Sequence, residues 1–457
     1  METHHHKRSA FSGKLGFVLS AAGASVGLGN IWRFPYLAAK YGGGIFLLIY
    51  IILAFTFGYT MIVAETALGR MTKKSPVGAF AAFGKGGGFA FGGWINAIIP
   101  ILIVPYYSVI GGWVIKYLVE YLRGGGSALA QDGYFSGFIS NGVSVELCFV
   151  VFTLFTLGII YAGVRNGVER VSKCMMPVLA VLSVIIAVYS VTRPGALAGV
   201  KYFLVPNLDN FSWMTVVSAM GQMFYSLSIA MGILITFGSY MKKDVSIEGS
   251  TTNVEIFDTA IAIMAGLMII PAVFAFSGGD PDTLQAGPAL MFITIPKVFD
   301  SMGMGTVVGV MFFLLVLFAA VTSSIALTES AVSTFEDELG WKRHKSTLLI
   351  GVIMLALGSL SALGYGPLAG VTVFGMQFLD LFDFLTNSVM MPIAAIATCL
   401  LVSRVVGVDK IEEEVTQNGG QFRRKAVFNF MIRYLCPLFA AIILVSSVAN
   451  ALGWIKM

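Results

Sequence analysis

The chain has 457 residues, of which 57% are hydrophobic and 12% are charged, and its mean hydropathy is +0.85. Soluble domains carry about 25% charged residues, so the composition excludes that class and indicates a membrane protein with several spans. The net charge of +5 requires no nucleic-acid partner, because basic residues at cytoplasmic loops face an anionic lipid leaflet.

Apolar segments long enough to cross a bilayer, about 20 residues each, divide the chain. We count eleven, centred on 15–38, 44–69, 94–120, 144–162, 174–192, 214–240, 254–276, 304–334, 347–363, 372–403 and 427–451. The sequence therefore predicts an all-α membrane protein with eleven transmembrane helices.

The basic residues predict the orientation of these spans. With a cytoplasmic N-terminus, twenty lysines and arginines fall on the cytoplasmic side and seven on the other. The positive-inside rule then places the N-terminus inside and, with eleven spans, the C-terminus outside. We expect a multi-pass protein of the cell (plasma) membrane.

The first span contains a stretch that a continuous membrane helix does not tolerate well. Residues 23–36 read GASVGLGNIWRFPY, with glycines, Asn30 and Arg33 in mid-membrane. An unwound segment persists in lipid only where protein, water or a solute satisfies its backbone. Its freed groups and half-helix ends then suit a carboxylate and a cation. The alternative is a packing helix softened by small residues.

Polar side chains in the second and third spans admit two interpretations. Glu65 needs a partner inside the membrane, and it serves either a function or the support of a neighbouring broken helix. The Tyr107 phenol needs an acceptor, which is either a substrate carboxylate or a carbonyl of a neighbouring helix.

Gly167 and Pro177 enclose the entry to the fifth span. Proline lacks the donor that holds a helix together, so this segment predicts a hinge that unwinds and opens a water path. A static kink is the alternative.

The sixth span contains a second polar and glycine-bearing stretch, GQMFYSLSIAMG at 221–232. It lies five spans after the first break. Interrupted segments at matching positions in two halves indicate an inverted repeat with a site between them. The repeats would be 15–192 and 214–403, with residues 1–14 as a cytoplasmic segment and 427–451 as an accessory helix. Residues 1–6, with three histidines, are interpreted as a tag remnant.

Two later spans carry further site candidates. Ala319, Thr322 and Ser323 share one helical face, and adjacent hydroxyls facing a broken helix make a hard-oxygen cation site. Hydroxyls bonded back to their own helix are the alternative. Asp258 and Asp383 are acids in or near the membrane, which are expensive unless paired.

Four motifs together resemble the neurotransmitter:sodium symporter family. They are GLGNIWRFP at 27–35, GQMFYSLS at 221–228, the spacing of Gly167 and Pro177, and AVTSS at 320–324. The resemblance covers the first ten spans and is closest to bacterial members that carry several hydrophobic amino acids. It implies the leucine-transporter fold, with a 5+5 inverted repeat and broken helices 1 and 6.

The resemblance also implies roles for individual residues. The substrate-binding positions would be Val26, Gly27, Leu28, Gly29, Ile103, Tyr107, Tyr225, Ser226, Ser228, Ala230, Met231, Ser324 and Leu327. The first sodium ion would be held by Ser25, Asn30, Ser226 and Asp258. The second would be held by Gly23, Val26, Ala319, Thr322 and Ser323.

Gates and hinge follow from the same resemblance. Arg33 and Asp383 would form the outer gate, and Tyr225 its aromatic lid. The inner gate would pair Arg8 with Asp337, supported by Ser239, Tyr240 and Glu329. Gly167 and Pro177 would form the hinge.

The resemblance implies a sodium-coupled symporter that imports hydrophobic L-amino acids by alternating access and uses two sodium ions. Asp258 occupies the position where relatives have an asparagine sodium ligand, so we expect the carboxylate to replace chloride. The alternatives are a substrate-gated ion channel and a non-transporting amino-acid sensor of the same fold. The sequence shows no nucleophile–base or metal constellation that would indicate an enzyme. Its partners would be the amino acid and the lipid bilayer.

Overall fold

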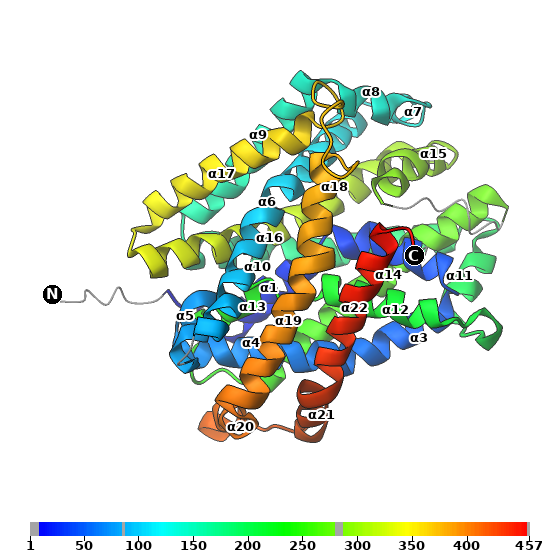
Figure 1. Ribbon diagram of the computed structural model, residues 1–457. Helices are drawn as coiled ribbons and strands as arrows, with labels where there is room; N and C mark the ends of the chain where they lie inside the picture. The colour runs from blue at the N-terminus through cyan, green and yellow to red at the C-terminus, as the bar shows by residue number, and fades with distance from the viewer. Residues whose placement is uncertain (1–8, 85–86, 279–286, 455–457) are drawn as a thin grey trace.

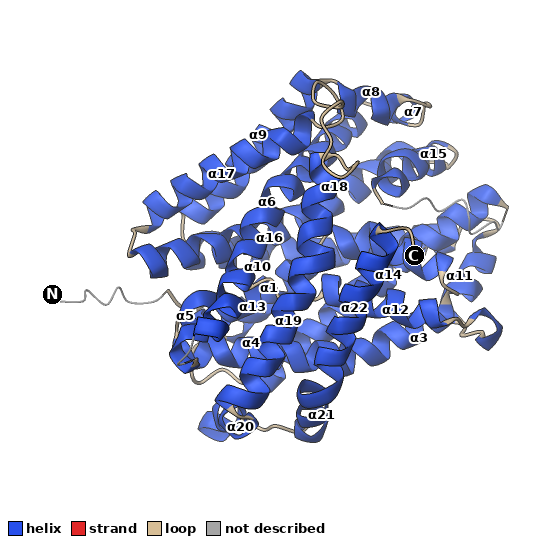
Figure 2. Ribbon diagram, in the orientation of Figure 1, coloured by secondary structure: helices blue, strands red, loops and turns tan. Residues whose placement is uncertain are grey.

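The computed structural model describes residues 9–84, 87–278 and 287–454, and regular structure in this part of the chain is helical (Figure 2). One isolated β-bridge pairs Val373 with Met376. The prediction of an all-α protein is confirmed.

Nine described helical runs are long and apolar enough to cross a membrane: Gly44–Thr72, Phe89–Leu122, Gly142–Tyr161, Val164–Val191, Ile247–Ser277, Gly305–Leu339, Arg343–Leu363, Phe378–Val406 and Lys425–Ala451. A tenth span is the pair Lys14–Ser25 and Gly29–Lys40, bent by 55°. The sixth predicted span consists of two helices of 14 and 8 residues, each too short to cross alone. Counting it, the described chain has the eleven predicted spans.

The main helices of the bundle have these bounds. In chain order they are α1 (Lys14–Ser25), η1 (Gly29–Arg33), α2 (Phe34–Lys40), α3 (Gly44–Leu53), η2 (Ala54–Gly58), α4 (Tyr59–Thr72), α6 (Gly87–Leu122), α9 (Gly142–Tyr161), η3 (Val164–Glu169), α10 (Arg170–Val191), α12 (Trp213–Ser226), α13 (Ile233–Tyr240), α14 (Ile247–Ser277), α16 (Gly305–Leu339), α17 (Arg343–Leu363), α18 (Phe378–Asp383), η7 (Phe384–Met390), α19 (Met391–Leu400), η8 (Leu401–Val406), α20 (Val408–Thr416), α21 (Lys425–Phe430), η10 (Met431–Leu435) and α22 (Cys436–Ala451).

Short helices cap the ends of the bundle. They are α5 (Pro76–Phe83), α7 (Gly126–Leu129), α8 (Tyr134–Ser140), α11 (Ala196–Leu204), η4 (Leu208–Asn210), η6 (Leu290–Thr294), α15 (Ile295–Asp300) and η9 (Gln417–Gly419). In Figure 1, α7, α8 and α15 gather at one end, whereas α20 and α21 lie at the opposite end. The run from α18 to α19 extends between the two ends.

Burial separates the inner helices from the outer ones. All eight residues of α13 are buried, as is 78% of the apolar window of Phe89–Leu122. The corresponding windows of Gly142–Tyr161 and Val164–Val191 are only 33% buried. Apolar side chains left exposed on a long helix are suited to lipid, so α9 and α10 have the burial of outer helices, and α9 lies with α17 along one edge of the bundle (Figure 1).

Both breaks predicted from sequence occur. The first leaves residues 26–27 outside helix between α1 and η1, and the second leaves 227–232 between α12 and α13. In the second break Ser228 and Ala230 adopt φ values of 52° and 59°, and Gly232 one of 70°. Such left-handed residues cannot continue an α-helix.

Candidate functional site

Side chains from other parts of the chain hold the backbone freed at the first break. The Ser228 hydroxyl donates to the Ala24 carbonyl over 2.9 Å, and Gln222 Nε2 donates to the Gly29 carbonyl over 3.0 Å. The Leu28 N–H donates to the Tyr107 hydroxyl over 3.3 Å. The break is thus internally satisfied, as an irregular segment in a membrane must be.

Glu65 supports the second break. Its Oε1 accepts a hydrogen bond from the Ala230 N–H over 2.8 Å, and the side chain is fully buried on α4. This contact agrees with the supporting role that the sequence left open. It also occupies the Ala230 N–H, which was predicted to bind substrate.

A cavity of about 30 Å³ lies between the two breaks. Its lining brings together residues from α1, the first break, η1, α6, α12, the second break and α16: Ala24, Ser25, Gly27, Leu28, Gly29, Asn30, Ile103, Tyr107, Tyr225, Ser226, Ser228, Met231, Ser323 and Leu327. Ten of the thirteen predicted substrate-binding residues line it. Val26, Ala230 and Ser324 do not.

Ser324 faces away from this cavity. Its hydroxyl lies 3.3 Å from that of Thr156 on α9, whereas the neighbouring Ser323 lines the cavity. A rotation of about 100° per residue separates adjacent positions on a helix, so only one of the two serines can point inward.

Glycine is required where side chains approach the first break. A Cβ on Gly29 would lie 2.5 Å from the Tyr225 ring, and one on Gly27 would lie 2.7 Å from the Ser323 hydroxyl. Both distances are shorter than any real Cβ contact. The two glycines therefore let Tyr225 and Ser323 pack directly against the backbone.

Asp258 bonds two of the other three residues predicted for the first sodium site. Asn30 Nδ2 donates to its Oδ1 over 2.8 Å, and the Ser226 hydroxyl donates to its Oδ2 over 3.0 Å. The fourth, Ser25, lines the same cavity and bonds back to the Ala21 carbonyl. Tyr50, which the sequence did not single out, donates to Asp258 Oδ2 over 3.1 Å. It is the only polar side chain between residues 44 and 53, a signal that could have identified it.

The five residues predicted for the second sodium site are also neighbours. The Ser323 hydroxyl lies 3.2 Å from the Gly23 carbonyl and 3.4 Å from the Val26 carbonyl. The Thr322 hydroxyl bonds back to the carbonyls of Phe318 and Ala319, as the alternative interpretation had it. Carbonyl and hydroxyl oxygens are the ligands that hard cations prefer, so the donor set fits sodium.

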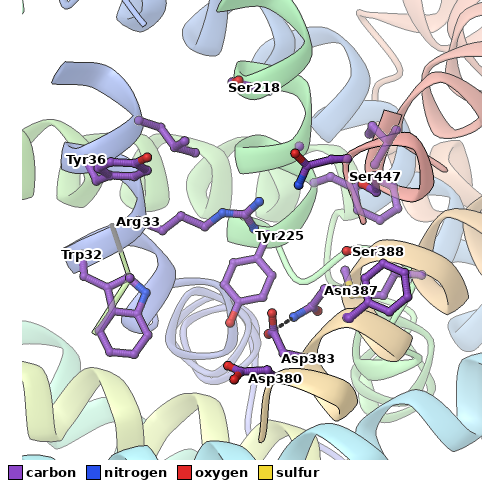
Figure 3. A pocket seen from close by; sticks show the side chains of 18 of the residues that line it. Trp32, Arg33, Tyr36, Ser218, Tyr225, Asp380, Asp383, Asn387, Ser388 and Ser447 are labelled. Carbon is purple, nitrogen blue, oxygen red and sulfur yellow. Dashed lines mark hydrogen bonds between the residues drawn. The ribbon is translucent and has the colours of Figure 1, made fainter. Parts of the chain in front are cut away.

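A larger cavity of about 570 Å³ adjoins the small one, and Leu28, Tyr107 and Tyr225 line both. Arg33 on η1, Tyr225 on α12, and Asp380 and Asp383 on α18 point into it (Figure 3). The Arg33 guanidinium lies 5.2 Å from the centre of the Tyr225 ring. Asp383 accepts hydrogen bonds from Tyr106 and Asn387. Within the described chain no bond joins Arg33 to Asp383, so the predicted outer pair is apart in this structure.

The predicted inner gate lies at the other end. Asp337 accepts from the Ser75 N–H over 2.6 Å, whereas Arg8 lies outside the described residues. Tyr240 donates to Glu329 over 2.8 Å, and the Ser239 hydroxyl bonds the Thr236 carbonyl. Arg343 also pairs with Glu329. The sequence did not reveal Arg343, although a buried acid in α16 required a cationic partner.

The predicted hinge is helical here. Gly167 lies in η3, where a Cβ would fall 2.0 Å from the Ile159 carbonyl, and Pro177 lies inside α10. Glu169, between them, accepts hydrogen bonds from the Ser12 N–H and from Lys173. This segment is therefore bound to the residues that precede α1.

Comparisons with known proteins identify relatives of this chain. The profile of the Sodium:neurotransmitter symporter family matches residues 8–125 and 135–454. An uncharacterized sodium-dependent transporter of Bacillus subtilis, YhdH, is 34% identical over 95% of this chain and 96% of its own length. An uncharacterized sodium-dependent transporter of Haemophilus influenzae is 30% identical over 98% of this chain and 100% of its own length. The sodium- and chloride-dependent GABA transporter 2 of Macaca fascicularis is 27% identical over 94% and 77%.

A solved structure shows the same fold. The crystal structure of MhsT in complex with L-phenylalanine superposes with a TM-score of 0.86 at 34% sequence identity, covering 96% of this chain and 100% of that one.

Two broken helices around a buried polar cavity, inside a multi-pass helical bundle, define a membrane transporter of the leucine-transporter fold. The chain belongs to the sodium:neurotransmitter symporter family.

Proposed function

We propose that the protein is a sodium-coupled symporter that imports hydrophobic L-amino acids by alternating access. The observation that carries this proposal is the cavity between the two breaks, where Asp258, Asn30 and Ser226 converge beside the unwound backbone. A zwitterion and a cation can share such a site, because the amino-acid carboxylate can ligate the ion directly.

The walls of the cavity support an apolar side chain as substrate. Ile103, Met231 and Leu327 supply its hydrophobic surface, and methionine adapts to side chains of different shape. The related MhsT binds L-phenylalanine. The Tyr107 hydroxyl and the Leu28 N–H, which already meet, would hold the substrate carboxylate.

Two sodium ions would bind, one at Ser25, Asn30, Ser226 and Asp258, the other at Gly23, Val26, Ala319, Thr322 and Ser323. We propose that transport is independent of chloride. Two cations and a zwitterion leave excess positive charge in a medium of low dielectric constant, where a compensating anion acts strongly. The buried Asp258 carboxylate supplies that anion within the protein.

The separation of Arg33 from Asp383 supports a cycle in which the large cavity closes around bound substrate. Arg8 and Asp337 would act at the opposite end, and residues 168–176 would unwind there. We further propose the two repeats at 15–192 and 214–403, a plasma-membrane location, a cytoplasmic N-terminus and an extracellular C-terminus.

Uptake into proteoliposomes tests the function. An inward sodium gradient should drive accumulation of L-phenylalanine above its external concentration, and replacing chloride with gluconate should leave the rate unchanged. Current without accumulation would indicate a channel, and sodium-dependent binding without accumulation would indicate a sensor. Either result would refute the symporter.

A further inference from the structure

A single arginine from the loop between α20 and α21 reaches into the helices that carry the candidate site. Arg424 Nη2 donates to Glu255 Oε2 over 2.7 Å and to the Thr252 hydroxyl over 2.8 Å, both on α14. Its Nη1 donates to the Phe55 carbonyl in η2 over 3.2 Å, and its guanidinium lies 3.5 Å from the centre of the Tyr59 ring. Arg424 therefore binds both helices at once.

A second contact runs in the opposite direction. The Glu248 carboxylate on α14 accepts hydrogen bonds from the backbone N–H groups of Arg423 and Arg424, over 2.8 and 3.1 Å. These groups precede the eleventh span, whose first N–H groups have no partner within the helix. Glu248 also accepts from the Tyr59 hydroxyl over 3.0 Å. The acid therefore caps one span while it joins two others.

The rest of the same loop is bound in a similar way. Arg70, at the end of α4, pairs with Glu414 on α20 over 2.6 Å and donates to the Val245 carbonyl, and both charged side chains are almost fully buried. Lys243 pairs with Glu414 as well. We call residues 414–424 the staple, because they join α4 and α14 to the loop that links α19 with α22.

The staple connects the candidate site to the cavity of about 570 Å³, which we call the outer cavity. Glu255 lies three residues from Asp258, on nearly the same face of α14. The helical run Phe378–Val406 leads directly into α20 and carries Asp383 at its far end, in the large cavity. Figure 1 shows this run extending the length of the molecule from α18 to α20. A series of bonded side chains and rigid helices thus links the site to Asp383, and energetic coupling between distant sites can travel through such a series.

We propose that Arg424 and Glu255 are positioning residues of the transport cycle: they make the tenth span follow α4 and α14, so that occupancy of the site is transmitted to Asp383. The proposal rests on the proposed symport. It assigns to the staple a role in movement and none in binding, because none of its residues lines the substrate cavity.

The test compares a neutral pair with a control in the same loop. Arg424→Met combined with Glu255→Gln removes both charges, so that neither is left buried alone. Lys425→Gln is the control, because Lys425 pairs with Glu412 on α20 and so ties the loop only to itself. Each is made with Ser388→Cys, a reporter that lines the outer cavity (Figure 3), and with Cys174→Ser, which removes an exposed native thiol.

In the parent and the control, sodium with L-phenylalanine should slow the reaction of a thiol reagent with the thiol introduced at position 388. In the neutral pair we expect the Kd for L-phenylalanine to stay within about twofold, turnover to fall at least about tenfold, and labelling to lose its response. Arg424→Lys, which keeps the charge without the planar fork, should give an intermediate turnover.

Parent-like turnover and labelling in the neutral pair would overturn the proposal. A loss of binding parallel to the loss of turnover would overturn it too, because the staple would then only maintain the site. If the neutral pair does not fold, Arg424→Lys with parent turnover and labelling overturns it. The labelling response needs no transport, so it tests the staple even if the accumulation experiment refutes symport.

Discussion

At the scale of single residues, two adjacent serines in α16 point in different directions and contact different parts of the structure. Ser323 faces the first break and Ser324 faces Thr156. The motif AVTSS identifies the segment, but a sequence cannot show which of two consecutive serines points inward until the rotation of the helix is fixed. Because Ser324 points away from the first break, a substitution of Ser324 is a matched control for one of Ser323.

The second sodium site predicts a sharp effect on ion affinity. Thr322→Val with Ser323→Ala removes two oxygen ligands at nearly constant volume, so sodium affinity should fall by about two orders of magnitude or more. Sodium titration of L-phenylalanine binding measures it. Ser324→Ala is the control and should titrate like the native protein. Unchanged sodium dependence in the double variant would disprove the site.

Asp258 predicts the anion requirement. Asp258→Asn removes a buried charge while keeping its shape, so uptake should be lost or should return only when chloride is supplied. Uptake in chloride and gluconate buffers distinguishes these results. Normal uptake by the variant in gluconate would show that the carboxylate does not replace an anion.

At the scale of elements, the two breaks were predictable because glycine and polar residues in mid-membrane are costly. The side chains that stabilise the breaks and the helices around them could not be predicted in the same way. Tyr50 and Gln222 act across tertiary contacts that no spacing in the chain reveals. Arg424 lies about 170 residues from Glu255, in a loop whose basic composition predicted only its side of the membrane. The sequence pattern shows which helices need partners for their backbone or charged groups. Only the packing of the folded chain determines which residue is that partner.

Support of the second break by Glu65 predicts a loss of stability. Glu65→Leu leaves the Ala230 N–H buried without a partner, which costs about 1 to 3 kcal/mol. Glu65→Gln keeps an acceptor oxygen at the same place and should lose less. Thermal unfolding in detergent measures both variants. Equal melting temperatures for the two would contradict the capping role.

The hinge predicts a change in hydrogen exchange. If residues 168–176 unwind when the inner end opens, their amides should exchange faster without sodium than with it. Pro177→Ala restores a helical donor and should reduce the difference. Equal protection with and without sodium in the native protein would leave only a static kink.

At the scale of the whole molecule, the two ends differ. Arg33 and Asp383, at one end, line a cavity of about 570 Å³ and are not bonded to each other in the described chain, whereas Tyr240 and Arg343, toward the other end, both bond Glu329. The resemblance names the groups that we expect to form the gates. It could not predict which gate is closed, because one sequence encodes every state of the cycle.

The outer gate predicts an effect on release. If Arg33 pairs with Asp383 when the cavity closes, Asp383→Asn should speed dissociation of L-phenylalanine by about tenfold while association changes little. Asp380→Asn is the control, since Asp380 lines the same cavity and bonds Tyr365. Identical dissociation rates for the two variants would argue against the pair.

The contact between Gly29 and the Tyr225 ring has an evolutionary consequence. Any side chain at position 29 would occupy the space of that ring, so the first mutation at either site alters what the other can accept. An alanine at position 29 fits only when a smaller residue replaces Tyr225. A smaller residue at position 225 also removes the aromatic ring that covers the site. The two positions, nearly 200 residues apart, therefore drift as a pair, and homologues with a larger residue at 29 should carry a smaller one at 225.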